Sequence, residues 1–152
     1  MNTHALEVAA SWWALGLLFA EDLIGVAQQA LGEGCDSPSL QALAALYTDQ
    51  VDEARGLFEE ALIELGVPQP STRDAVMRLA REVAKDIMSN AISPETGAKR
   101  VASLVRAAPD SVANYVELHT FLYAASEWED RPEDRHVFEA GVVAAAKMIV
   151  AS

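Results

Sequence analysis

The chain is 152 residues long; 51% of its residues are hydrophobic and 22% are charged. A chain of this length and composition buries enough apolar surface to fold without disulfides or metals, which excludes an intrinsically disordered protein. Its net charge of −12 argues against nucleic-acid binding, because a phosphate backbone would be repelled, and favours a basic protein partner.

Apolar residues recur at helical spacing in nearly every window between the turns, and no window alternates with the period of two that strands require. The sequence therefore predicts an all-α fold, a single-domain bundle over residues 1–152 with about six or seven mostly antiparallel helices. The first predicted helix runs from His4 to Leu31 and ends at Gly32 and Gly34, a glycine stop. Its broad apolar surface is typical of a central helix.

Serine, threonine, aspartate or proline marks the start of each remaining helix. The polar side chains accept hydrogen bonds from free amides of the first turn, and proline fits there because its missing N–H would have no partner. Short connections should fold neighbouring helices back on one another. The predicted helices are Ser37 to Tyr47, Thr48 to Gly66, Ser71 to Ser89, Ser93 to Arg106, Asp110 to Ser126 and Pro132 to Val150.

The negative charge is concentrated at the N-terminal side of the chain. Residues 1–72 carry one basic residue against eleven acidic ones, residues 73–106 carry seven against four, and residues 107–152 carry three against eight. The most apolar segment, Val8 to Ala20, is too short to span a bilayer and follows no Lys or Arg. Neither a membrane anchor nor a signal peptide is expected. The single cysteine, Cys35, cannot form an internal disulfide, so a reducing cytoplasm is the expected location.

The predicted helix from Thr48 to Leu65 has one apolar and one acidic face. At 100° per residue its apolar side chains share one side of the helix, and the acidic ones lie on the other with Arg55 as the nearby basic residue. We call these acidic residues the acidic stripe: Asp49, Asp52, Glu53, Glu59, Glu60 and Glu64. The stripe has two interpretations, a solvated face that keeps the chain soluble and a docking surface for a basic partner.

Two histidines support an enzymatic alternative. His119 lies among aromatic and aliphatic residues and could act as a general base with a nearby carboxylate. His136 follows Glu133 at the Glu-x-x-His spacing of di-iron bundles, but such a site needs a second copy, and this chain has one. Phosphate-binding loops, serine elbows and His-Glu-x-x-His motifs are all missing from the sequence. No cofactor, metal or catalytic residue is therefore expected.

The predicted helix from Ser71 to Ser89 carries most of the basic residues of its region. Its acidic residues are spaced to pair with them along the helix. The same helix could instead dock on the acidic stripe of a second copy, so a structural homodimer is a third alternative. The residues concerned are Arg73, Arg78, Arg81 and Lys85, with Asp74, Glu82 and Asp86.

Three segments resemble small, uncharacterised bacterial helical proteins. They are the Gly34-x-Asp36-Ser37-Pro38-x-Leu40 segment, the segment from Phe58 to Gly66, and Ile92-Ser93-Pro94 followed by Gly97-Ala98. Some proteins of this kind belong to toxin and immunity loci, whose immunity members are often acidic binders of basic toxins. The resemblance implies a small helical protein and carries over no catalytic residue.

The leading hypothesis is a non-enzymatic cytoplasmic protein-binding domain, in its most concrete form an immunity protein that neutralises a cognate toxin. The acidic stripe would supply complementary charge around an apolar contact. The alternatives are a small helical enzyme or ligand-binding bundle that uses His119 or His136, and a structural homodimer.

Overall fold

A computed structural model describes residues 1–110 and 112–152 of the chain. These residues form eight α-helices and four short 3₁₀ turns, and no strand occurs among them. The all-α prediction is confirmed, and the predicted count of six or seven helices is too low. The chain divides into two compact units, Met1–Ser71 and Thr72–Ser152, which we call unit 1 and unit 2 and describe separately. The single-domain assignment stays a prediction.

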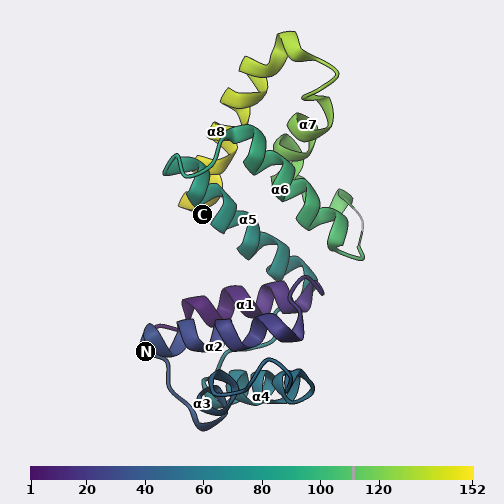
Figure 1. Cartoon of the computed structure of the whole chain (residues 1–152). Helices are drawn as coiled ribbons and strands as arrows, with labels where there is room; N and C mark the ends of the chain where they lie inside the picture. The colour runs from purple at the N-terminus through teal and green to yellow at the C-terminus, as the bar shows by residue number, and fades with distance from the viewer. Residues whose placement is uncertain (111) are drawn as a thin grey trace. The chain divides into compact units, whose positions relative to one another are not determined.

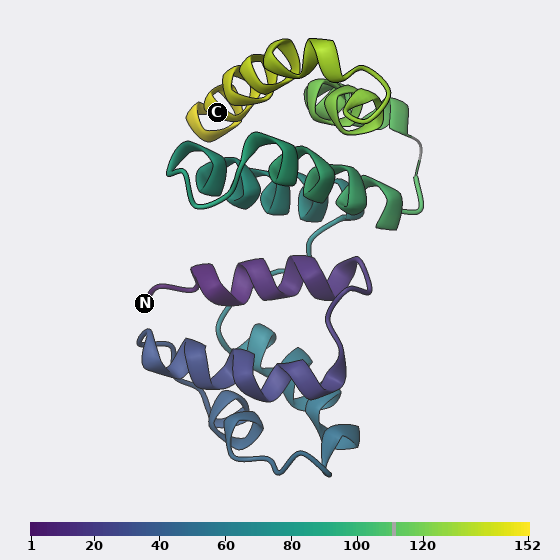
Figure 2. The same cartoon turned by 45° about the horizontal axis from the view of Figure 1, so that its top comes forward.

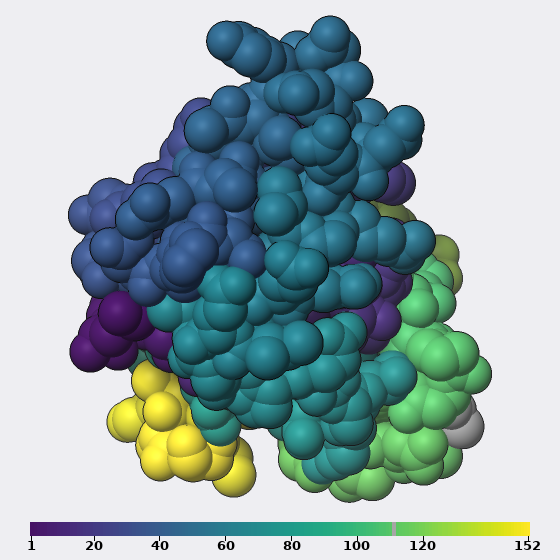
Figure 3. All heavy atoms as spheres, turned by 90° about the horizontal axis from the view of Figure 1, so that it is seen from below, coloured from purple at the N-terminus to yellow at the C-terminus, as the bar shows by residue number. Residues whose placement is uncertain are grey.

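Unit 1 is built from four helices around a small apolar core. Helix α1 lies beside α2, α2 packs on α3, and α3 packs on α4 (Figure 1). Figure 3 draws all heavy atoms and shows the region of α3 and α4, in blue, as one continuous surface. The fully buried large side chains are Leu6, Leu23, Leu40, Leu43 and Phe58. The elements are α1 (His4–Ala14), η1 (Ala20–Asp22), α2 (Leu23–Gly32), α3 (Pro38–Ala44) and α4 (Val51–Glu64).

The predicted first helix is wrong, because the chain breaks it into α1 and α2. The Leu17 N–H donates to the Trp12 carbonyl and the Gly16 N–H to the Trp13 carbonyl, both at 3.0 Å. Gly16 adopts a φ of 69°, which a residue with a Cβ rarely takes. These bonds form a Schellman C-cap, so α1 ends although the residues that follow are as apolar as those before.

Two of the predicted helix starts are confirmed by their hydrogen bonds. The Ser37 hydroxyl accepts from the Leu40 N–H and the Ser93 hydroxyl from the Thr96 N–H, each at 3.1 Å. The predicted cap at Thr48 is wrong, because α4 begins at Val51 after Gln50. The Gln50 side chain instead accepts from the Tyr47 N–H at 2.8 Å, and this bond closes the turn before the helix.

Unit 2 is a closed four-helix arrangement. Helix α5 packs on α6, α6 on α7, α7 on α8, and α8 returns to α5, as Figure 2 shows from a second direction. The first of these helices is strongly amphipathic, with its buried positions on one face. The elements are α5 (Thr72–Met88), α6 (Pro94–Ala107), η2 (Val112–Asn114), η3 (Val116–Leu118), α7 (His119–Glu127), η4 (Pro132–Asp134) and α8 (Arg135–Ala151).

The segment before α7 differs from the prediction of a helix that starts at Asp110. The Asp110 carboxylate accepts a hydrogen bond from the Tyr115 hydroxyl at 2.7 Å, and the Tyr115 ring is fully buried. Burial, together with the bond to Asp110, raises the pKa of Tyr115 to about 12. Arg73 of α5 pairs with Glu117 at 2.5 Å. The segment therefore folds around a buried tyrosine, and α7 begins only at His119.

Candidate partner-binding surface on unit 1

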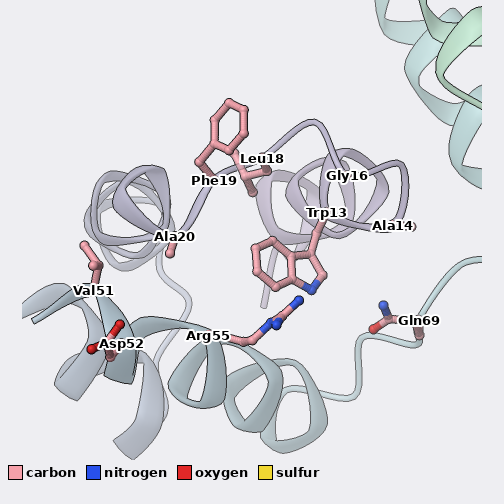
Figure 4. Close-up of a pocket in the computed structure, with 10 residues that line it drawn as sticks. All are labelled: Trp13, Ala14, Gly16, Leu18, Phe19, Ala20, Val51, Asp52, Arg55 and Gln69. Atoms are coloured by element: carbon pink, nitrogen blue, oxygen red, sulfur yellow. The ribbon is translucent and has the colours of Figure 1, made fainter.

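A groove opens on unit 1 between the α1–α2 connection and α4 (Figure 4). Its volume is about 610 Å³, within the usual range of ligand and side-chain pockets. We call it the unit 1 groove. It is lined by Trp13, Ala14, Gly16, Leu18, Phe19, Ala20, Val51, Asp52, Arg55 and Gln69.

The floor of the groove is held by Trp13. Its indole ring packs edge-on against the buried Phe58 ring, with centroids 5.7 Å apart and planes at 68°, a favourable aromatic geometry. The Arg55 guanidinium lies 5.2 Å from the centre of the same indole and 4.0 Å from the Glu59 carboxylate. Arg55 is the one Lys or Arg residue of unit 1. Its cation–π contact holds the guanidinium against the Trp13 indole.

An exposed apolar edge borders the groove. Phe19 is 62% exposed and Leu17 is 39% exposed, and Figure 4 shows the Phe19 ring turned away from Asp52 and Arg55. The Phe19 N–H donates to the Asp22 carboxylate at 3.0 Å, which fixes the backbone at the start of η1. An exposed phenylalanine on a fixed backbone offers a contact area that a partner could bury at little cost in entropy.

Asp52, in the N-terminal half of the acidic stripe, lines the groove that this edge borders. Asp49, Asp52 and Glu53 are exposed. The turn η1, which packs on α4, adds the exposed Glu21 and Asp22. Carboxylates at the start of α4 also interact favourably with its helix dipole, and a field of one sign surrounds the apolar edge.

The C-terminal half of the stripe makes contacts within the fold. Glu64 accepts hydrogen bonds from the Ser39 N–H at 3.0 Å and from the Ser39 hydroxyl at 2.5 Å, and Glu60 accepts from the same hydroxyl at 3.2 Å. Both glutamates thus satisfy polar groups in the first turn of α3. The Ser39 hydroxyl, its amide and the Ser37 hydroxyl hold the pKa of Glu64 below its usual value. Glu60 and Glu64 therefore join α4 to α3, whereas Glu59 pairs with Arg55 one turn earlier on α4 itself.

Replacing Glu64 with glutamine should destabilise the protein in a pH-dependent way. Because the pKa of Glu64 is lowered in the folded chain, its carboxylate stabilises the fold fully above the unfolded pKa, at about pH 4.5, and this contribution is lost as pH falls through the lowered pKa. Urea unfolding should show the variant less stable than wild type at about pH 7, and the difference should shrink as pH falls below about 4.5.

The matched control is Glu53→Gln, on the same helix and exposed, with no hydrogen bond or ion pair described for its side chain. It should change the stability little over the same pH range. A loss in Glu64→Gln that does not change with pH would contradict a role for the charged carboxylate in capping α3.

The two candidate histidines are exposed and lie in unit 2. A His119 ring nitrogen lies 3.4 Å from the Val112 carbonyl oxygen. Within residues 1–110 and 112–152, no hydrogen bond joins His119 or His136 to a carboxylate, and no cluster of His, Cys, Asp and Glu is arranged to hold a metal ion. The pKa of the Glu117 carboxyl is lowered, first by its hydrogen bond with Arg73 and also by its proximity to His119. The enzymatic alternative stays a prediction.

A second, smaller groove lies between α6 and α7, with a volume of about 290 Å³. Its walls are mostly aliphatic, and Lys99 and Arg106 lie at its edge. Lys99 already pairs with Glu95 at 3.1 Å and with Glu129 at 3.2 Å. His119 and His136 do not line it. In the part of the chain that the structure describes, no helix has the length and apolar character to cross a membrane.

Sequence reasoning found the stripe but missed the groove. The available signal was Gly16, a helix-breaking residue in the middle of an apolar run and three residues before Phe19. Searches of protein-family models, curated proteins and solved structures find no match to this chain. The resemblance to bacterial helical proteins stays a prediction.

Proposed function

We propose that the chain is a non-enzymatic protein-binding protein and that unit 1 binds a basic partner at the apolar edge of its groove. The observation that carries the proposal is the exposed Phe19 at a groove that Asp52 also lines, in a unit whose exposed residues include Glu21, Asp49 and Glu53. Unit 1 holds eleven acidic residues against one basic residue, a net charge of −10. The most concrete form of this proposal is a cytoplasmic immunity protein that neutralises a cognate toxin.

The charge and the apolar edge would act at different stages of binding. A field of one sign raises the rate of encounter with a basic protein and weakens as salt screens it. A buried aromatic side chain at the centre of an interface slows dissociation. A partner that fits both features would present basic residues around an apolar hollow that accepts the Phe19 ring.

Affinity purification of the tagged protein from extract of its native cells tests the proposal. The experiment compares low and high salt, with the bound proteins identified by mass spectrometry. We expect one basic protein that is retained at low salt and reduced at high salt. Recovery of no protein at either salt would contradict a protein-binding role.

Reversing the charge of Asp49, Asp52 and Glu53 to lysine should slow association with the recovered partner by at least about tenfold and flatten its salt dependence. Stopped-flow or surface plasmon resonance measurements at several salt concentrations give both quantities. The matched control reverses three exposed acidic residues of unit 2, Asp86, Asp130 and Glu133, and changes the net charge by the same amount.

An equal slowing in the unit 2 control would assign the effect to net charge rather than to the surface of unit 1. Phe19→Ala, measured in the same assay, separates the two parts of the surface. It should raise the dissociation rate and leave the association rate within about threefold of wild type. Unchanged rates in both the triple variant and Phe19→Ala would place the partner elsewhere.

A further inference from the structure

The outward side of α8 in unit 2 is apolar. From Ala140 to Ala151 the helix contains one charged residue, Lys147. Met148 is 75% exposed and Val137 is 56% exposed, and Val143 and Val150 are also exposed. We call the exposed apolar residues of this helix the outer face of α8: Val137, Ala140, Val143, Ala144, Met148, Val150 and Ala151.

The opposite side of α8 already makes the contacts that hold it in unit 2. Phe138, Val142, Ala146 and Ile149 are buried, and α8 packs on α5 and α7. A helix at the surface of a globular unit normally carries charged residues on its other side. From Ala140 to Ala151 the outward side of α8 carries Lys147 as its one charged residue, and exposed apolar patches of this kind mark interaction sites.

Two opposite charges flank Val143 along α8. Glu139 lies one turn before Val143 and Lys147 one turn after it, and both are exposed. Neither takes part in an ion pair within the described residues. Because residues four apart share one side of a helix, the order along this side is acidic, apolar, basic. A second α8 running the opposite way, centred at Val143, would place each Glu139 opposite a Lys147.

The net charges of the two units favour unit 2 for contact between copies. Unit 2 carries ten basic and twelve acidic residues, a net charge of −2, whereas unit 1 carries −10. Two copies that associate through unit 2 therefore experience less charge repulsion than two copies that associate through unit 1. Ala140 and Ala144 leave room for two helices to approach closely, and a two-fold contact brings the same face of each copy together.

We propose that the outer face of α8 binds the same face of a second copy, with the two helices antiparallel around a two-fold axis at Val143. In this arrangement Val143 contacts the partner's Val143. Glu139 pairs with the partner's Lys147, and Lys147 with the partner's Glu139. The contact residues of the proposed dimer include none that line the unit 1 groove. The test of this proposal is therefore independent of the test of the proposed function.

Charge exchange tests the register of the dimer. Sedimentation equilibrium over a range of protein concentrations gives the dimerisation constant of wild type, Glu139→Lys, Lys147→Glu and the double variant. Each single change places like charges opposite one another at two positions, so dimerisation should weaken by about tenfold. The double variant restores opposite charges at both positions and should return the constant to within about threefold of wild type.

Glu139→Lys is the decisive variant, because it makes an acidic protein less acidic. General repulsion between copies predicts tighter association, whereas the proposed pairing predicts weaker association. The matched control is Glu133→Lys, which changes the net charge equally from an exposed position before α8. It should dimerise at least as well as wild type.

Circular dichroism of each variant shows whether the fold is retained before the constants are compared. A wild-type protein that stays monomeric at the highest soluble concentration would overturn the proposal. A double variant no tighter than the single variants would also overturn it, and so would an equal weakening in Glu133→Lys.

Discussion

Replacing Phe58 with alanine should lower the free energy of unfolding of unit 1 by about 3–5 kcal/mol. Phe58 is fully buried in α4 and belongs to the apolar core of unit 1 together with Leu6, Leu23 and Leu40. The other buried residues of this core are mostly alanine and leucine, which cannot move far enough to refill the space of a phenyl ring. A unit of this size has a total stability of about 4–10 kcal/mol, so the variant should be close to unfolding.

Loss of the Phe58 ring should also change the unit 1 groove. Trp13 packs edge-on against Phe58 and carries the Arg55 guanidinium on its face. Without this support the indole should become more mobile, and its emission should shift to longer wavelength before the main unfolding transition. Chemical denaturation followed by circular dichroism and tryptophan fluorescence measures both effects.

The control for Phe58→Ala is Ile63→Ala. Ile63 lies on the same helix and is 80% exposed, so its truncation should change the stability by less than about 0.5 kcal/mol. A similar loss in both variants would contradict the assignment of Phe58 to the core.

The parts of the fold that sequence reasoning predicted correctly depend on nearby residues. Ser37 and Ser93 each cap a helix through a bond to an amide three residues later, and the proline that follows each serine fits the first turn. These interactions need no information about distant segments. The same is true of the alternation of buried and exposed positions along α5, which repeats with the period of one helix.

The errors arise where a local signal competes with a longer pattern. The apolar run from Val8 to Ala20 reads as one continuous helix, but the Schellman bonds at Gly16 end α1 within it. Aspartate is a residue type that often caps helices, but the Asp110 carboxylate accepts a hydrogen bond from the Tyr115 hydroxyl. Local signals of this kind are weak, and only the packed structure shows which of them determines the backbone.

The candidate surface was predictable only in part for a related reason. The helical period predicts an exposed side for all six residues of the acidic stripe. The structure finds each of them exposed, five on α4 and Asp49 in the turn before it. The helical period could not show that Glu60 and Glu64 reach Ser39, because that contact joins residues more than twenty positions apart. The groove beside Phe19 likewise forms only when η1 packs on α4.

Replacing Gly97 with alanine should destabilise unit 2 by about 1–2 kcal/mol, although alanine is the better helix former. Gly97 lies in the first turns of α6, and a Cβ at this position would lie 2.6 Å from the Ile87 Cγ1 of α5 and closer still to its Cδ1. Ile87 is 4% exposed, so its side chain has little room to move. Urea unfolding followed by circular dichroism gives the change. The control is Gly141→Ala in α8, where the new Cβ would make an ordinary 3.5 Å contact with Thr120 and should stabilise the unit by about 0.5–1 kcal/mol.

A double-mutant cycle separates the clash from any other effect of the substitution. Ile87→Ala alone should cost about 2–5 kcal/mol because it leaves a cavity between α5 and α6. In that background the Cβ at position 97 has no Ile87 atoms to meet, so Gly97→Ala should become neutral or stabilising through helix propensity alone. A coupling energy of about 1–3 kcal/mol between the two sites would follow. An equal cost of Gly97→Ala with and without Ile87 would contradict the clash between α5 and α6 as its cause. The requirement for glycine would then come from the backbone conformation of α6.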